Sequence, residues 1–369
     1  MEYTEVDGVK LSRLGMGNMR LPVEGGKLAG HIDTETATAM VDFALASGVN
    51  YFDTAYIYHK GASESFLGEA LSRYPRDSYH LATKFFIGAN PNYKSVFERQ
   101  LSKLKTDYID FYLIHSVFDV TSKAYRSSGA IEYFLEQKER GRIGHLGFSS
   151  HMSPGMLRGF CKHHDWDFVQ LQLNYDDWLF GAAREQYDIA CSFGLPIIVM
   201  EPVKGGRLAD LGKKANAQLR EREPERSIAS WGMRWLMRLP QVKVVLSGMS
   251  TLEQMRDNVA TFSEAAPLSD ADALLLENVC RSTHNRNVLP CTSCRYCCDS
   301  CPEHIDIPRM LALYNKMKTD GKRAMRTAAR ADDLTDVPAT CIACGACTRH
   351  CPQSIDVPHA LHKLASALR

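Results

Sequence analysis

One cysteine motif occurs twice near the end of this 369-residue chain, and it restricts the folds open to that region more than any other feature. Each copy has the spacing C-x2-C-x2-C-x3-C-P, and the eight cysteines are Cys291, Cys294, Cys297, Cys301, Cys341, Cys344, Cys347 and Cys351. Ten of the twelve cysteines lie in the last quarter of the chain, which favours metal ligation over scattered disulfides. The segments around them are too short to build a large core, and a domain of that kind needs additional stabilisation, such as bound metal or disulfides.

The duplicated motif resembles that of helical two-cluster ferredoxin domains, from Cys291 to the end of the chain. Both copies continue alike, with Ile-Asp-Ile-Pro after the first and Ile-Asp-Val-Pro after the second, before helix-like segments at Pro308–Lys318 and His359–Leu368. In proteins with two such clusters, the fourth cysteine of each run ligates the other cluster. The resemblance implies two [4Fe-4S] clusters, one held by Cys291, Cys294, Cys297 and Cys351 and the other by Cys341, Cys344, Cys347 and Cys301.

Two other uses of these cysteines are weaker. Structural zinc normally takes four ligands without a third regular C-x2-C step, and disulfides do not suit the cytoplasm. Cys298 has no counterpart in the second copy, so it is either a bystander or a replacement for Cys297 as ligand. The other three cysteines, at positions 161, 191 and 280, are expected to be ordinary buried thiols.

Before the cysteines, short apolar runs alternate with amphipathic stretches, the pattern of repeated βα units around a parallel sheet. The expected strands are Leu14–Met19, Val49–Asp53, His80–Lys84, Ile109–His115, Ile143–Ser149, Phe168–Asn174, Pro196–Met200 and Val242–Ser247. The expected helices include Thr34–Ala46, Ser63–Ser72, Tyr93–Leu104, Ile131–Arg140, Thr251–Ala260 and Asp270–Arg286. Eight such units predict an α/β fold, a (β/α)8 TIM barrel at residues 1–268. A linker helix at 269–290 and a small, mainly helical two-cluster domain at 291–369 follow it.

Composition excludes several classes of protein. Apolar residues make up 45% of the chain and the formal net charge is +1, so neither disorder nor a nucleic-acid partner is expected. The amino terminus carries no apolar signal segment, and no later stretch is long enough to cross a bilayer. We therefore expect a cytoplasmic protein without a membrane partner.

Polar side chains end several of the expected strands, where barrels of this kind place their chemistry. Asp53, Lys84, His115, Ser149 and Asn174 each end or closely follow a strand. A charged side chain at an inward barrel rim is costly unless it is paired. The pattern therefore indicates an active site at this end of the barrel.

Three segments resemble signatures of the aldo-keto reductases: the run from Asn50 to Tyr58 with Ser63-Glu64 after it, Thr83-Lys84, and Asp107–His115. The resemblance spans about residues 9–258 and implies a catalytic tetrad of Asp53, Tyr58, Lys84 and His115. In that scheme Tyr58 donates a proton to the carbonyl oxygen, and the Lys84 ammonium lowers the pKa of the phenol. Asp53 keeps Lys84 charged, and His115 orients the substrate oxygen or relays a proton. Tyr56 is a competitor for the role of Tyr58.

The same resemblance implies a nicotinamide site. Ser149, Ser150, Gln170 and Asn174 fall where the family holds the carboxamide, and Met200 falls where an aromatic ring usually stacks, although Ser150 replaces the commoner asparagine. In the adenosine-phosphate segment that ends at Asn258, Gly248 and Gln254 stand where many relatives use Lys and Arg to grip a 2′-phosphate. This favours NADH over NADPH and leaves a flavin open. Lys204, with Arg207 and the glycines between them, either neutralises a phosphate or forms a solvated loop.

A hydride carries two electrons, whereas each [4Fe-4S] cluster moves one, so a flavin would bridge the two halves well. The main expectation is an oxidoreductase acting at a carbonyl or alcohol centre of a small molecule. Its clusters would exchange electrons with a ferredoxin-like or flavodoxin-like partner. Structural or regulatory clusters beside ordinary nicotinamide chemistry, and cluster-fed reduction without free hydride, stay open. The alternative from another class is a catalytically silent barrel that serves as a redox-sensing or electron-transfer module.

Overall fold

The computed structural model describes residues 1–26, 31–264, 266–285 and 287–369. The chain divides into two compact units: Met1–Val203 with Asn216–Val279, and Lys204–Ala215 with Cys280–Arg369. These units differ from the expected domains, because a segment inside the barrel sequence belongs to the second unit and half of the expected linker helix, residues 269–279, belongs to the first. That helix spans Asp270–Thr283, and its expected last residue, Arg286, lies outside the described residues.

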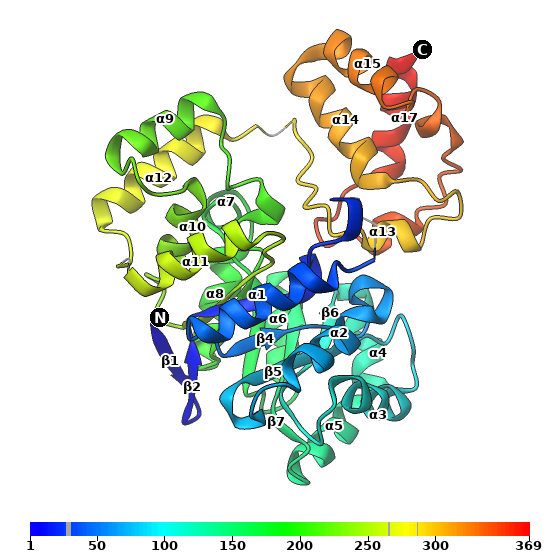
Figure 1. Ribbon diagram of the computed structural model, residues 1–369. Helices are drawn as coiled ribbons and strands as arrows, with labels where there is room; N and C mark the ends of the chain where they lie inside the picture. Colours follow the sequence, from blue (N-terminus) through cyan, green and yellow to red (C-terminus); the bar gives the residue numbers. More distant parts are fainter. Residues whose placement is uncertain (27–30, 265, 286) are drawn as a thin grey trace. The chain divides into compact units, whose positions relative to one another are not determined.

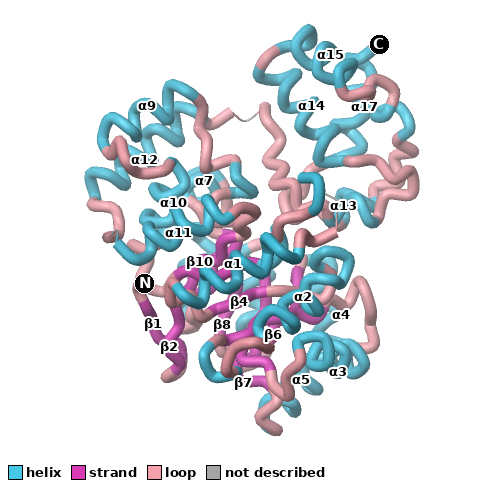
Figure 2. Tube along the Cα trace, viewed as in Figure 1, coloured by secondary structure: helices cyan, strands magenta, loops and turns pink. Residues whose placement is uncertain are grey.

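The first unit is a closed barrel of eight parallel strands, in the order β10-β3-β4-β5-β6-β7-β8-β9. Figures 1 and 2 show strands of this barrel with helices around them. Its strands are β3 (Leu14–Gly17), β4 (Tyr51–Asp53), β5 (His80–Phe85), β6 (Ile109–Val117), β7 (Ile143–Ser150), β8 (Phe168–Gln172), β9 (Ile197–Met200) and β10 (Val242–Ser247). Each lies within or overlaps one of the eight expected runs. The predicted (β/α)8 barrel is therefore confirmed.

Helices follow the strands and surround them, because their apolar faces need burial that the sheet provides. They are α1 (Thr34–Ala46), α2 (Ala62–Leu71), α3 (Tyr93–Leu104), α4 (Asp119–Ser127), α5 (Ala130–Glu139), α6 (Pro154–Cys161), α7 (Tyr175–Phe180), α8 (Ala183–Ser192), α9 (Lys213–Arg222), α10 (Ile228–Leu236), α11 (Leu252–Glu264) and α12 (Asp270–Thr283). Side-chain caps begin several of them; Asp33, for example, accepts from the Thr36 amide at the start of α1. Such caps satisfy amide groups that have no partner within the helix.

The barrel closes between β10 and β3, where Val245 pairs with Leu14 and Ser247 with Met16. Gly15 lies between those two β3 residues, and a Cβ there would approach side-chain atoms of Leu246 and Val244 to within 2.8 Å. A glycine at this position therefore leaves room for the layers of apolar side chains that fill the interior.

An antiparallel hairpin precedes the barrel, and the sequence analysis does not anticipate it. Its strands are β1 (Tyr3–Val6) and β2 (Val9–Ser12). Val6 and Leu11 belong to the same buried cluster as the interior residues Tyr51 and Phe111. The hairpin thus contributes side chains to the barrel core.

The second unit is mainly helical, with α13 (Tyr296–Asp299), α14 (Ile307–Thr319), α15 (Gly321–Ala331), α16 (Ala346–Arg349) and α17 (Val357–Leu368). In Figure 1, α14, α15 and α17 lie together, and their buried faces share one apolar cluster that includes Met310, Met325 and Leu364. The backbone repeats with the sequence: Ser293 and Ala343 both have φ 55°, and Arg295 and Gly345 both lie in the left-handed region. The duplication is therefore one of structure as well as of spacing.

Within the part of the chain that the structure describes, we find no helix with the length and apolar character needed to span a membrane.

Candidate active site and cluster sites

Lys84 lies at the centre of a buried polar group at the carboxyl ends of two neighbouring strands. Its ammonium donates to Asp53 Oδ1 at 2.5 Å and to the carbonyl oxygen of Thr54 at 2.7 Å. Its Nζ also lies 3.5 Å from the hydroxyl oxygen of Tyr58. Asp53 ends β4 and Lys84 is next to last in β5, so parallel pairing of these strands sets the carboxylate beside the ammonium.

Tyr58 comes from a 3-10 turn that follows β4, and the backbone of this turn is strained. The next two residues, His59 and Lys60, have φ values of 50° and 55°, and Gly61 continues in the left-handed region at 88°. Non-glycine residues rarely adopt this region unless the surrounding structure imposes it, and such strain often marks functional sites. Here the strained turn carries the tyrosine whose hydroxyl lies next to Lys84.

Burial and pairing act in opposite directions on the two charged groups. Burial raises the pKa of the Asp53 carboxyl, and the Lys84 ammonium opposes that rise. Burial lowers the pKa of Lys84, and the Asp53 carboxylate opposes that fall. Each group is therefore kept charged mainly by the other, as expected for a close buried pair.

His115 lies at the edge of the same group. Its ring centroid is 5.8 Å from that of Tyr58 and 5.7 Å from that of Phe86, both in edge-on arrangements. Burial lowers the pKa of His115 well below its usual value, with Lys84 and His151 adding to the effect. A neutral imidazole at pH 7 follows, which can hydrogen-bond a substrate oxygen without carrying charge. The structure thus brings together all four residues of the predicted tetrad.

Tyr56 occupies a different environment from Tyr58. Its hydroxyl accepts a hydrogen bond from Arg99 at 3.4 Å, and the Lys103 ammonium lies over its ring, 5.4 Å from the centroid. Lys84 instead lies 4.9 Å from the centre of the Tyr58 ring. The geometry therefore favours Tyr58 over Tyr56 as the proton donor.

A second buried network lies behind Lys84. Glu64, on α2, is fully buried and accepts from Thr83 Oγ1 at 2.8 Å and from Gln100 Nε2 at 2.6 Å. Gln100 also donates to the Lys84 carbonyl oxygen at 3.1 Å. Burial raises the pKa of Glu64, and these hydrogen bonds oppose that rise. The network fixes the end of β5 and places a second carboxyl group near the ammonium, where its charge raises the pKa of Lys84.

The residues expected to hold a nicotinamide ring already have partners within the protein. Ser149 Oγ accepts from the Ser116 amide at 2.7 Å, and Ser150 Oγ accepts from the Met152 amide at 3.1 Å. Gln170 Nε2 donates to Asp53 Oδ2 at 3.2 Å. The serine hydroxyl hydrogens and the Gln170 carbonyl oxygen can still form bonds to a ligand, so the set fits a carboxamide while also supporting the tetrad.

Asn174 has a structural use. Its Oδ1 accepts from the Asp177 amide at 2.8 Å, which caps α7, and its Nδ2 donates to Asp177 Oδ2 and to the Glu201 carbonyl oxygen. Both ends of the amide are thus engaged. Met200 ends β9 and is half-buried.

Arg20 lies where the sequence analysis expects no cation. A Cβ on Gly248 would lie 3.1 to 3.3 Å from three methylene carbons of Arg20, so the arginine stem crosses this glycine. Gln254 accepts from the Ser250 amide at 2.8 Å, and Asn258 donates to Ser247 Oγ at 2.9 Å. The Arg20 stem, from the segment after β3, therefore lies against the segment that the sequence predicts to hold the adenosine phosphate.

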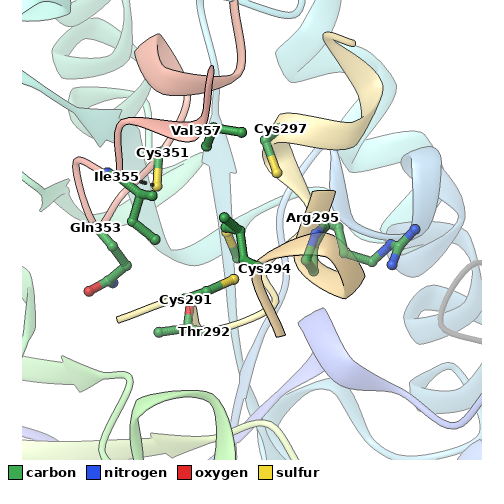
Figure 3. Close-up of a pocket in the computed structure, with 11 residues that line it drawn as sticks. Cys291, Thr292, Cys294, Arg295, Cys297, Cys351, Gln353, Ile355 and Val357 are labelled. Carbon is green, nitrogen blue, oxygen red and sulfur yellow. Dashed lines mark hydrogen bonds between the residues drawn. The ribbon is translucent and has the colours of Figure 1, made fainter. Parts of the chain in front are cut away.

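Four cysteines from both copies of the duplicated motif surround one pocket in the second unit. Cys291, Cys294, Cys297 and Cys351 line a space of about 320 Å³, together with apolar side chains such as Leu311, Ile355 and Val357 (Figure 3). The Ile355 amide donates to Cys351 Sγ at 3.5 Å. Amide hydrogen bonds of this kind stabilise a thiolate ligand and tune the potential of an iron–sulfur cluster.

The other four cysteines line a second pocket of about 310 Å³, namely Cys301, Cys341, Cys344 and Cys347. Among the described residues, no three Cys, His, Asp or Glu side chains converge closely enough to hold a single metal ion. Each set of four thiols lines one space, and four cysteine thiolates are the ligand set of a [4Fe-4S] cluster. The grouping is the crossed one expected from the sequence. Cys298 lines neither pocket.

The segment that follows β9 packs against the first of these pockets. Lys204–Ala215 belongs to the second unit, and a Cβ on Gly205 would lie only 2.4 Å from the carbonyl oxygen of Thr292. Arg207 donates to the carbonyl oxygen of Leu289 at 3.3 Å. Gly205 and Arg207 thus contact the start of the first cluster motif, while Gly206 and Arg207 are exposed to solvent.

Comparison with known proteins agrees with this geometry. Residues 13–279 match the aldo/keto reductase family, and residues 290–355 match the 4Fe-4S dicluster domain. The chain belongs to the aldo/keto reductase family. It is thus an oxidoreductase whose barrel is followed by a 4Fe-4S dicluster domain.

Several relatives of this aldo/keto reductase cover most of its barrel. It is 26% identical to the uncharacterised oxidoreductase YqkF of Bacillus subtilis, over 68% of this chain and 86% of the relative. It is 24% identical to an NADH-specific methylglyoxal reductase of Escherichia coli, over 73% and 95%. Among solved structures, the thermostable aldo-keto reductase Tm1743 gives a TM-score of 0.63 at 22% identity, covering 76% of this chain and all of that one. That last likeness concerns the fold.

Sequence reasoning about this aldo/keto reductase missed some residues of the site. Ser63-Glu64 is part of a recognised signature, but nothing local indicates that Glu64 is buried against Gln100, 36 positions away. Arg20 lies 228 positions from Gly248 in the sequence, so no spacing rule links them. No local signal marks Glu64, because acidic side chains are mostly exposed and its partner Gln100 lies on another helix.

Proposed function

We propose that this aldo/keto reductase interconverts a carbonyl and an alcohol on a small molecule, with Tyr58 as the acid-base group and the clusters as an electron relay to the barrel. The observation that carries the proposal is the buried Lys84 ammonium, 2.5 Å from Asp53 and 3.5 Å from the Tyr58 hydroxyl. A fully buried charge is expensive to maintain. Its position next to a phenol argues against a catalytically silent barrel.

The chain's own residues have distinct parts in this chemistry. In the reducing direction, the Tyr58 hydroxyl gives its proton to the substrate oxygen, and the Lys84 ammonium stabilises the phenolate that is left. Asp53 holds Lys84 in place and keeps it charged. The neutral His115 ring donates to or accepts from the substrate oxygen and sets its direction. In the oxidising direction the Tyr58 phenolate accepts the proton.

A nicotinamide or flavin held by Ser149, Ser150 and Gln170 would supply the hydride equivalent, and the clusters would supply single electrons. We infer NADH as the nicotinamide form, since Gly248 and Gln254 replace the cations expected for NADPH, although Arg20 adds a positive charge there. A thiolate-rich chain of this kind also fits a reducing compartment such as the cytoplasm.

The first test compares two tyrosine variants. Tyr58→Phe is expected to reduce kcat for carbonyl reduction about 100-fold or more, since general acid catalysis contributes at least that much. Tyr56→Phe is the matched control, because its hydroxyl meets Arg99 instead of Lys84, and it should keep nearly full activity. Equal activity of Tyr58→Phe and the wild type would reject the acid-base assignment.

A second test addresses the relay. Anaerobically purified protein is analysed for iron, sulfide and acid-released flavin, with about eight irons per chain expected for two cubanes. The clusters are then reduced with dithionite, freed of excess reductant and mixed with candidate carbonyl substrates, while their EPR signal is followed. A substrate should reoxidise the clusters of the wild type far faster than those of Tyr58→Phe. Clusters that stay reduced while a nicotinamide supports turnover would limit them to a structural or regulatory part.

A further inference from the structure

Thr292 and Ile342 hold equivalent positions in the two copies of the cysteine motif, but their surroundings differ. Each directly follows the first cysteine of its run. Thr292 is 2% exposed, whereas Ile342 is 61% exposed. The two residues after Ile342, Ala343 and the cluster cysteine Cys344, are exposed as well, while their counterparts Ser293 and Cys294 are partly buried. The duplicated sequence therefore builds one covered face and one uncovered face.

The cover over Thr292 is the segment that leaves the barrel. Five residues after Met200 ends β9, Gly205 packs against the Thr292 backbone, and Arg207 is anchored to Leu289. Gly205 has φ 66° and no Cβ, and both properties allow this approach. The first cluster pocket thus adjoins a segment that continues directly from a barrel strand.

The equivalent face at the second pocket shows an apolar side chain to solvent next to a cluster ligand. Single exposed apolar residues are common and need no explanation. This one lines the pocket itself, with Cys344 exposed two positions later. Burial of such a cysteine would have cost little, because thiols are among the most buried side chains. Electrons reach a cluster most readily where its ligands come to the surface.

The charge of this region suits an acidic partner. Residues 291–369 contain eleven lysines and arginines against eight aspartates and glutamates. Arg349 is exposed, and its guanidinium lies 3.7 Å from the Cβ position of Gly345 in the second motif. Glu303, which also lines the pocket, is the acidic exception. A net positive unit attracts an acidic protein within about one Debye length, roughly 10 Å at moderate salt.

We propose that the face formed by Ile342, Ala343, Cys344 and Arg349 is the docking surface for an acidic single-electron carrier protein. The inference rests on the proposed function in one respect, that both pockets hold redox-active clusters. Each docking event transfers one electron: the carrier is oxidised, the second cluster is reduced, and no atoms are exchanged. The first cluster, covered by the segment from β9, is the internal member of the pair. Two docking events supply the two electrons that a carbonyl reduction consumes.

Redox encounters use small interfaces, so one apolar side chain can carry much of the binding. The test uses a reduced [4Fe-4S] ferredoxin of net negative charge as the carrier and follows reduction of the oxidised holoenzyme by stopped-flow absorbance. Ile342→Asp is expected to lower the second-order rate constant about tenfold. Arg349→Glu should lower it at low salt, with the difference from wild type shrinking at high salt.

Three controls make the outcome decisive. Leu274→Asp changes a similarly exposed apolar residue on α12 of the first unit, and it should leave the rate unchanged. Reduction by dithionite needs no docking and should be equal in all variants. Iron content and EPR spin quantity verify that Ile342→Asp carries its clusters. Wild-type rates in both Ile342→Asp and Arg349→Glu overturn the proposal, as does an equal loss in Leu274→Asp.

Failure of the relay would look different. In that case the carrier still reduces the clusters at a rate that depends on Ile342, but substrate does not reoxidise them. Failure of the docking proposal leaves the rate of cluster reduction independent of Ile342, whatever the substrate does.

Discussion

Lys84 Nζ lies 2.5 Å from Asp53 Oδ1, and neither side chain has appreciable contact with solvent. Removal of one member leaves the other buried and unpaired, which typically costs about 3 kcal/mol or more. Lys84→Met should therefore lower the free energy of unfolding of the barrel by about that amount. The double variant Asp53→Asn/Lys84→Met should lose less than the sum of the two single variants.

All four tryptophans lie in the first unit, so their fluorescence during urea unfolding reports on the barrel. Strict additivity of the two substitutions would mean that the pair contributes nothing through its mutual charge.

The lowered pKa of His115 leads to a prediction about pH. Burial and the Lys84 ammonium keep this imidazole neutral well below pH 6.5. His115 is therefore protonated only at a lower pH than an ordinary histidine. As a result, kcat/KM for carbonyl reduction should stay level from pH 7.5 to 6 instead of falling near pH 6.5. Stability also depends on this lowered pKa. The contribution of neutral His115 to the free energy of unfolding is complete above pH 6.5, and it is lost as the pH falls toward the folded-state pKa.

Steady-state rates of wild type and His115→Gln over this range provide the check. A fall centred near pH 6.5 that is present in the wild type and absent in His115→Gln would show that His115 titrates in its ordinary range.

Gly205 offers a test of the contact beside the first cluster pocket. A Cβ at this position would lie 2.4 Å from the Thr292 carbonyl oxygen and 2.8 Å from its Cα, both backbone atoms that cannot rotate away. Gly205→Ala should displace the start of the first motif, and iron should fall from about eight toward about four per chain, as loss of one of two cubanes requires. Anaerobic iron and sulfide analysis measures this.

Gly206→Ala is the matched control. Its φ is 95°, so an alanine there is also strained, but nothing lies within 4 Å of its Cβ position. Equal iron loss in both variants would attribute the effect to backbone strain alone rather than to the contact with Thr292.

Arg20 gives a prediction on cofactor choice. Its stem crosses Gly248, so its charge is placed to compensate in part for the missing family cations. Arg20→Gln should weaken NADPH binding about tenfold, with a smaller effect on NADH, because only NADPH carries the 2′-phosphate. Titration of nicotinamide fluorescence gives both dissociation constants. An equal loss for both cofactors would place Arg20 against the shared pyrophosphate instead.

The barrel was predictable because its strands are short apolar runs, several of which end at or near a polar residue, and this pattern is local. Asp53 and Lys84 could be expected to meet because adjacent parallel strands end together. Local patterns did not reveal that Gln170 donates to Asp53, or that the Asn174 side chain caps α7. The partner of each of these side chains is the acceptor that lies nearest once the chain has packed. Contacts between residues far apart in the sequence determine which acceptor that is.

The segment from Lys204 to Ala215 shows the same limit more clearly. Its glycines and charges predict a loop, but its membership in the second unit depends on residues 65 or more positions later. The hairpin before β3 also went unrecognised, because four-residue strands contain too little periodicity to be distinguished from a turn-rich terminus.

The chain passes from the first unit to the second at Lys204, back at Asn216, and again to the second at Cys280. On the ribosome, the segment that covers Thr292 is therefore made well before the residues on which it packs. At about 5–20 residues per second, several seconds pass before Thr292 is synthesised, and more before Cys351 completes the first pocket. Insertion of iron and packing of the Lys204–Ala215 segment on Thr292 are thus both late events in biogenesis. A chain truncated after Val279 would keep the barrel strands, but the segment after β9 would lack the residues on which it packs.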